Sequence, residues 1–211
     1  MSLTDEQIER YSRQIILPEV GGRGQERLLA ARVVVAGDGA AAVAAATLLG
    51  RAGIGTLDVG EAIGALPELS TDCRVERHPT VEQAPVADVV VDLTADTVVS
   101  AVLARRRQAG RPFVLGGLPT GVDVIVYTVV GRPCVACLGR HPLDTRRARH
   151  SAHLEAPAAS ILAALAAMET LRVLLLAPSG GRMTHASMIT GNVFSTEPPP
   201  AGGCPLCEGG A

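Results

Sequence analysis

Residues 32–42 read RVVVAGDGAAA: a run of β-branched residues, then a glycine turn, then a run of alanines. A short apolar run without alternation is typical of a strand buried on both faces of a parallel sheet. We predict a strand over 32–36, a turn at 37–39 and a helix over 40–52. This order is the setting in which backbone N–H groups at a helix N-terminus bind phosphate.

The glycine turn departs from the usual dinucleotide-binding pattern. Alanine replaces the last glycine, the two alanines after the turn crowd the approach, and Asp38 adds negative charge near any phosphate. Glu61, at the end of the next predicted strand, can accept hydrogen bonds from ribose hydroxyls. The pattern therefore predicts a Rossmann-type turn with Gly37, Gly39 and Glu61 as candidate nucleotide-binding residues. It leaves open whether a nucleotide binds there.

Strand and helix patterns alternate on both sides of this stretch. Alternation of this kind favours a doubly wound, mostly parallel, Rossmann-like α/β sheet with a C-terminal antiparallel portion, here in a single domain over 1–211. The run over 123–130 is typical of an antiparallel strand, and we expect it to close the sheet. Further strands are predicted over 56–59, 73–77, 87–92, 112–116 and, as one or two strands, 183–194; helices are predicted over 5–16, 25–31, 97–109 and 156–176.

Four of the five cysteines form two C-x-x-C pairs, Cys134 with Cys137 and Cys204 with Cys207. Two such pairs can supply the four thiolates of a tetrahedral structural zinc site, which would tie the C-terminal tail to the middle of the chain. The alternative is a pair of redox-active or disulfide-forming motifs. Proline and glycine beside each pair favour the zinc site, since a redox C-x-x-C usually opens a helix. Cys73 is expected to be a small strand residue.

Composition argues against several classes of protein. A net charge of −2 and 2% aromatic residues, with no tryptophan, give no reason to expect nucleic-acid binding. The polar, acidic N-terminus does not resemble a signal or transit peptide. The longest apolar run, 156–176, is interrupted by Glu169 and Arg172, so we expect no membrane span. These features predict a cytoplasmic protein, in which zinc is more plausible than disulfides.

Several blocks of the sequence resemble the ThiF/MoeB/HesA family, the bacterial relatives of ubiquitin-activating enzymes. They are RYSRQIILPEVGGRGQERL at 10–28, AGIGTL at 52–57, DVVVDLTAD at 88–96, GRPCVACL at 131–138, AALAAMETLRVLL at 163–175 and the final CPLC at 204–207. The resemblance implies one α/β domain that forms homodimers. It also implies a reaction in which Mg-ATP adenylates the C-terminal glycine of a small ubiquitin-like sulfur-carrier protein, releasing pyrophosphate.

The resemblance assigns roles to individual residues. Arg13 matches the arginine that reaches the ATP phosphates of the partner subunit; the alternative is a helix-face arginine in a surface salt bridge. Glu61 matches the ribose-binding acid, usually aspartate; the alternative is a solvated loop residue. In the family's D-x-T-D-N motif an aspartate binds Mg²⁺, whereas here Ala95 takes that place and Asp96 stands one position late.

Other departures remove positive charge from the expected ATP site. The family's segment with asparagine and arginine after the ribose-binding acid, and the lysine-bearing helix that follows, have no counterpart here; all 19 basic residues of the chain are arginines. Adenylation needs such cations to offset the triphosphate charge. ATP and Mg²⁺ binding are therefore doubtful.

Two hypotheses follow. One is a degenerate family member that keeps dimerisation and binds a carrier protein ending in Gly-Gly, or another carboxylate partner. The other is an active adenylyltransferase that uses a reduced site built from Arg13, Gly37, Gly39, Glu61 and Asp96. The loop over 139–154 is rich in arginine and histidine, which suits either an anionic ligand or a solvated surface.

Overall fold

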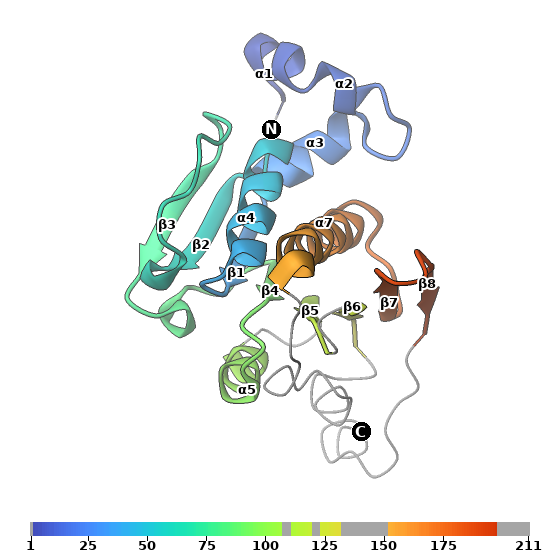
Figure 1. The fold of residues 1–211 in the computed structure, drawn as a ribbon. Helices are drawn as coiled ribbons and strands as arrows, with labels where there is room; N and C mark the ends of the chain where they lie inside the picture. The colour runs from blue at the N-terminus through green and yellow to red at the C-terminus, as the bar shows by residue number, and fades with distance from the viewer. Residues whose placement is uncertain (1, 107–110, 120–122, 132–151, 198–211) are drawn as a thin grey trace, which may run out of the picture.

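The computed structural model describes residues 2–106, 111–119, 123–131 and 152–197. Its centre is an eight-stranded sheet in the order β3-β2-β1-β4-β5-β6-β7-β8 (Figure 1). The strands are β1 Arg32–Ala36, β2 Thr56–Gly60, β3 Arg74–His78, β4 Val89–Asp92, β5 Phe113–Gly117, β6 Asp123–Val129, β7 Arg182–Ser187 and β8 Val193–Thr196. The helices are α1 Asp5–Arg10, α2 Ser12–Ile15, α3 Gly21–Ala30, α4 Ala40–Ala52, α5 Thr97–Arg106 and α7 Ala152–Leu176, with short 3₁₀ helices η1 Glu61–Ile63 and η2 Val81–Gln83.

The sheet has a parallel core and an antiparallel C-terminal part. Strands β3, β2, β1, β4 and β5 are parallel, and β6, β7 and β8 each pair antiparallel with the preceding strand of the sheet. The predicted α/β class is confirmed, as is the antiparallel direction of β6. The expectation that β6 closes the sheet is wrong, because the hairpin of β7 and β8 extends the sheet beyond it.

Helices lie on both faces of the parallel core. Successive side chains of β1 point to opposite faces, and they enter two separate apolar clusters. Val33 and Val35 pack in the larger cluster with residues of α4 and α7, while Val34 and Ala36 pack in the smaller one with Leu103 of α5. Both faces of β1 are therefore buried, as the unbroken apolar run predicted.

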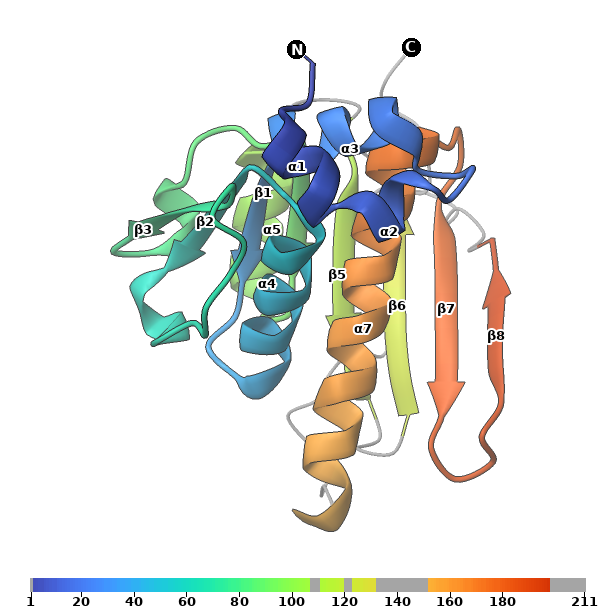
Figure 2. The same cartoon turned by 90° about the horizontal axis from the view of Figure 1, so that it is seen from above.

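Helix α7 is the main cover of the larger apolar cluster, where it contacts α4, β5 and β6 (Figure 2). By length and composition, Ala156–Leu176 is apolar enough to cross a membrane, with a mean hydropathy of 1.8. In the structure its fully buried Glu169 accepts hydrogen bonds from Thr128 of β6 (2.5 Å), Arg172 (2.8 Å) and Arg182 of β7 (3.3 Å). These bonds join α7 to the antiparallel part of the sheet. The larger cluster includes buried apolar residues of α7: Leu162, Ala166, Ala167 and Val173.

The sequence AGIGTL forms a close junction between α3, α4 and β2. Gly53 ends α4 in the left-handed conformation, with φ +94°, which glycine adopts without steric cost. A Cβ atom on Gly55 would lie 1.8 Å from the carbonyl oxygen of Leu29 in α3. The Gly55 N–H donates to the Leu28 carbonyl (3.1 Å), and its carbonyl accepts from the N–H of Arg74 (2.9 Å). Only glycine allows α3 to approach β2 this closely.

The N-terminal segment differs from its prediction in one respect. A single helix over 5–16 is expected, whereas the structure has α1 and α2 separated by Tyr11. Thr4 caps α1, with a reciprocal pair of hydrogen bonds to Gln7. Tyr11 is 1% exposed, and placing its ring in the interior interrupts the helix.

We predict that Gly55→Ala destabilises the fold by more than about 3 kcal/mol or prevents folding, since the overlap is with backbone and cannot be relieved by a side-chain rotation. Gly22→Ala in α3 is the matched control: a Cβ there meets no atom within 4 Å, so the change is expected to stabilise by about 0.5–1 kcal/mol. Urea unfolding of both variants measures the difference. Equal stabilities would contradict the assigned role of Gly55.

Candidate functional site at the carboxyl edge of the parallel strands

The carboxyl ends of β1 and β4 define the place where the order of the parallel strands reverses. From β1 the chain proceeds to β2 on one side, while β4 and β5 lie on the other. Ligands of open α/β sheets bind in the crevice outside such a switch point. The glycine turn follows β1 and residues 93–96 follow β4, so both predicted ligand-binding segments lie at this point.

Gly37 is required by the geometry of the turn. Its φ is +136°, and a Cβ atom there would lie 2.9 Å from the Cβ of Ala42 and 3.2 Å from the carbonyl oxygen of Leu93. A side chain would therefore separate the start of α4 from the end of β4. Because Gly37 has no side chain, the start of α4 and the end of β4 can lie close together at the switch point.

Gly39 lies on the open side of the same turn. It is the N-cap of α4, with φ −92°, and a Cβ atom there would meet nothing within 4 Å. No side chain caps this end of the helix, so its first N–H groups face open space together with the positive end of the helix dipole. This arrangement fits an anionic group such as a nucleotide phosphate. The exposed carboxylate of Asp38 beside it opposes that binding electrostatically.

The segment after β4 is held by its own hydrogen bonds. Asp92 is buried and accepts from the Thr94 N–H (3.0 Å), the Thr94 hydroxyl (2.7 Å) and the Ser100 hydroxyl. Burial raises the pKa of the Asp92 carboxyl, and the hydrogen bonds from Ser100 and Thr94 oppose that rise. Sequence reasoning did not single out Asp92. A polar residue ending an apolar strand, with threonine two positions later, was the available signal.

Asp96 serves as the N-cap of α5. Its Oδ1 accepts from the N–H groups of Val98 (2.8 Å) and Val99 (3.3 Å). Ala95, at the position where the family carries its metal-binding aspartate, has φ +52°. This left-handed conformation is unfavourable for alanine and easier for aspartate or asparagine. The backbone conformation at position 95 therefore suits aspartate, but the residue there is alanine, which has no carboxylate.

Glu61 also lies at this edge. It follows β2, opens η1 and is exposed. Because Val35 pairs with Val59 in adjacent parallel strands, the chain leaves β1 at Gly37 and β2 at Glu61 side by side. The structure thus brings together four of the predicted site residues: Gly37, Gly39, Glu61 and Asp96.

Arg13 lies near the end of α4 that is opposite to the glycine turn. The Gln25 side chain donates to the Ala52 carbonyl (3.2 Å) at the C-terminus of α4, and Tyr11 packs beside Gly53. α4 has 13 residues and is therefore about 20 Å long. The exposed Arg13, two residues after Tyr11, therefore cannot reach Gly39 of its own chain. Figure 2 shows α2, which carries Arg13, beside one end of α4.

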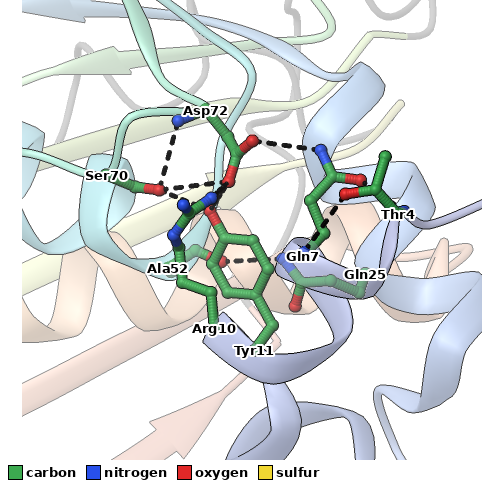
Figure 3. Close-up of polar contacts among 8 residues, drawn as sticks. All are labelled: Thr4, Gln7, Arg10, Tyr11, Gln25, Ala52, Ser70 and Asp72. Atoms are coloured by element: carbon green, nitrogen blue, oxygen red, sulfur yellow. Dashed lines mark hydrogen bonds and ion pairs between the residues drawn. The ribbon is translucent and has the colours of Figure 1, made fainter.

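A carboxylate fixes the segment that carries Arg13. Asp72, in the loop before β3, accepts hydrogen bonds from Gln7 (3.0 Å), from Tyr11 (3.1 Å) and from Arg10 (Figure 3). The Tyr11 hydroxyl also lies 2.6 Å from the Ser70 hydroxyl. Burial works to raise the pKa of Asp72, but the hydrogen bonds from Gln7, Arg10 and Tyr11 outweigh it and lower the pKa. Arg10 and Tyr11, the first two residues of the RYSRQ block, therefore hold α1 and α2 against the loop.

The cysteine pairs, Cys134 with Cys137 and Cys204 with Cys207, lie outside the described residues, as does most of the arginine- and histidine-rich segment over 139–154. Cys73 is described, and it precedes β3 by one residue where a strand position was expected. Burial raises the pKa of its thiol to about 11, which suits a packing residue.

The strand order and the glycine turn at its switch point define a Rossmann-type α/β protein. Relatives include the Anopheles gambiae adenylyltransferase and sulfurtransferase MOCS3. The two sequences are 30% identical over an alignment of 216 positions, which covers 82% of this chain and 48% of that protein. The Haloferax volcanii SAMP-activating enzyme E1 is 32% identical over 174 residues, 65% of this chain and 64% of that protein. The chain spans about half the length of the first of these relatives. No protein-family model matches the chain.

Solved structures share the fold. The Escherichia coli MccB structure with MccA-N7isoASN superposes with a TM-score of 0.71 at 16% identity, over 94% of this chain and 74% of that chain. PaaA superposes with a TM-score of 0.66 at 16% identity, over 92% of this chain and 84% of that chain. These structures show the shared fold. The sequence relatives confirm the resemblance: the chain belongs to the ThiF/MoeB/HesA family.

We predict that Asp72→Asn lowers the free energy of unfolding by about 1 kcal/mol near neutral pH, mainly through weaker bonds to Gln7 and Tyr11; the exposed Arg10 pair adds little. Because the folded-state pKa of Asp72 lies below its ordinary value of 3.8, its contribution is present above that value and is lost as the pH falls through the folded-state pKa. Urea unfolding near neutrality and well below pH 3.8 measures it.

The exposed Glu68→Gln in the same loop is the control and should show little change at either pH. A difference between wild type and Asp72→Asn that stayed constant down to acid pH would contradict the role given to the carboxylate.

Proposed function

We propose that this chain is a degenerate ThiF/MoeB-type protein. It keeps the nucleotide-binding turn, has lost the triphosphate and Mg²⁺ chemistry, and binds a carrier protein or another carboxylate partner. The crossover between β2 and β3 is the observation that carries the proposal. Residues 61–73 contain only the three-residue η1. The lysine-bearing helix that the family resemblance places after the ribose-binding acid has no room in this crossover.

Two features after β4 support the same proposal. Ala95 offers no ligand atom at the expected metal position, and the Asp96 carboxylate already accepts two backbone hydrogen bonds as the cap of α5. Binding Mg²⁺ through Asp96 would compete with that cap. Losing several groups that stabilise transferred phosphate, each contributing roughly 3 kcal/mol, would slow adenylation by many orders of magnitude.

An active adenylyltransferase is the second candidate, and the open N-terminus of α4 at Gly39 favours it. In that reaction an oxygen of a carboxylate attacks the α-phosphorus of ATP, an acyl-adenylate forms and pyrophosphate leaves. The N–H groups beyond Gly39 would hold a phosphate, Glu61 would accept from the ribose hydroxyls, and Arg13 would come from a second chain. Relatives named as adenylyltransferases, and MccB crystallised with ATP, support this candidate.

The partner proposed in either case is a small ubiquitin-like sulfur-carrier protein ending in Gly-Gly. A Thermus thermophilus relative, 49% identical over 61 residues covering 29% of this chain and 22% of that protein, is named a sulfur carrier protein adenylyltransferase. We further propose a homodimer, a structural zinc ion held by the four paired cysteines, and a cytoplasmic location. The distance between Arg13 and the glycine turn supports the homodimer, because the two can meet only between chains.

We predict no robust ATP–pyrophosphate exchange by this chain across a panel of Gly-Gly-tailed carriers and small carboxylic acids. Ala95→Asp should not restore exchange, since the cations that clamp the triphosphate would still be missing. Turnover of roughly 1 per second that is abolished by Arg13→Ala would contradict the hypothesis of a degenerate site and support the active adenylyltransferase. A rise in melting temperature with Mg-ATP, in the absence of exchange, would show that the chain binds ATP without catalysing adenylation.

We predict a particle of twice 21.7 kDa in native mass spectrometry, carrying about one zinc ion per chain. Cys204→Ser should release the zinc and lower the stability while leaving the sheet folded, because all eight strands lie within residues 32–196. A metal-free monomer, purified without chelators, would contradict both proposals.

A further inference from the structure

A second group of ligand-type side chains lies on β2 and β3, away from the glycine turn. Asp58 of β2 is directly opposite Glu76 of β3 in the parallel register. His78 follows Glu76 by two residues, so all three side chains are on the same face of the sheet. Val34, the neighbour of Asp58 on β1, belongs to the apolar cluster of α5. The three residues therefore share the sheet face of α5, at the edge formed by β3.

The ligand atoms of this group are close together. One atom each from Asp58, Glu76 and His78 lie within 4.8 Å of one another, and His78 Nε2 is 2.7 Å from Asp58 Oδ1. Asp58 is fully buried, and its second oxygen, Oδ2, is enclosed without a hydrogen-bond partner. Buried carboxylate oxygens are normally satisfied by a donor or a cation. The unpartnered Oδ2 is an observation independent of the clustering, and it leaves Asp58 with an unused acceptor.

Arg32 is the nearest positive charge, but its contacts are long. Its guanidinium lies 3.4 Å from Asp58 Oδ1 and 3.3 Å from Glu76 Oε1, whereas charge-assisted bonds are usually about 2.7–2.9 Å. None of these contacts reaches Asp58 Oδ2. The Arg32 side chain is 27% exposed, so it can turn outward into solvent. Arg74, which contacts Glu76 at 3.1 Å, is 78% exposed and equally able to move.

We propose that Asp58, Glu76 and His78 bind a divalent cation of the zinc class, a site separate from the paired cysteines and from the proposed nucleotide site. One imidazole nitrogen and two carboxylates are three ligands suited to zinc, with the fourth tetrahedral position open to water. The histidine disfavours Mg²⁺ and Ca²⁺, which prefer oxygen ligands throughout. The ion occupies the place of the Arg32 guanidinium, supplies Asp58 Oδ2 with a partner and draws the three ligands together.

Zn²⁺ titration of the full chain in competition with a chromophoric chelator tests the site. The wild type is expected to bind one ion per chain beyond any that remain on the cysteines after purification. Glu76→Gln and His78→Gln should each weaken this binding by more than about 100-fold, since losing a ligand exceeds the 10–100-fold cost of losing a supporting residue. His185→Gln is the matched control: its Nε2 is 3.3 Å from Asp123, another half-buried histidine–aspartate pair in the same sheet.

Nuclear magnetic resonance of the imidazole nitrogens provides a second readout, in which Zn²⁺ should shift the signals of His78 and leave those of His185 in place. Glu76→Gln keeps the size of a side chain that is 24% exposed and removes its charge, so it decides the case even where His78→Gln fails to fold. Equal Zn²⁺ uptake by wild type and Glu76→Gln, an equal loss in His185→Gln, or no ion bound with Zn²⁺ in excess would each overturn the proposal.

Discussion

The approach of Gly55 to the Leu29 carbonyl is the constraint on which the N-terminal half of the structure depends. At this point backbone groups of α3, the end of α4, β2 and β3 meet, and a Cβ atom added to Gly55 would lie 1.8 Å from the carbonyl oxygen of Leu29. Docking α3 here brings the Gln25 amide to the end of α4 and seats Tyr11 against Gly53. Tyr11 and Asp72 then set the position of α1 and α2. The absence of a side chain at Gly55 thus determines where α2, which carries Arg13, lies on the protein.

The two ends of α4 have different characters. Its C-terminus is enclosed by the glycine junction and the polar contacts of the N-terminal block, whereas its N-terminus is open, uncapped and faced by acidic side chains. The first end supports the architecture shared with the family. The second has the open backbone N–H groups that suit an anionic group, and under the proposed function it no longer supports phosphate chemistry. Because the structural end and the candidate ligand-binding end of α4 are separate, substitutions at the second end can change ligand binding while the fold is retained.

Much of the fold follows from local patterns in the sequence. The unbroken apolar run and the glycine turn gave β1 and α4 with their observed bounds, and the remaining strands lie within a few residues of their predicted positions. The two predictions that were wrong, the end of the sheet and the single helix over 5–16, both depend on long-range contacts. Nothing local to 123–130 indicates that β7 and β8 will extend the sheet, and the break at Tyr11 arises because its ring docks against residues about sixty positions away.

The candidate site divides in the same way. Gly37, Gly39 and Glu61 could be recognised because each stands directly beside a strand end, and parallel strands bring their carboxyl ends together. Asp96 was identified by alignment to a motif, yet its side chain caps a helix, a use that spacing alone does not reveal. The group of Asp58, Glu76 and His78 depends on the pairing register of β2 with β3. No local pattern specifies that register, because the crossover between the strands is irregular.

The late position of α7 in the chain has a consequence for synthesis on the ribosome. Strands β1 to β4 and helix α4 are complete by Asp92, and domains tend to fold from the N-terminus as they emerge. The helix that covers α4, β5 and β6 ends only at Leu176. Until it emerges, the apolar face of α4 and its neighbouring strands is left uncovered, and such surfaces promote aggregation. The nascent chain therefore passes through a stage at which chaperone binding would matter more than the final stability.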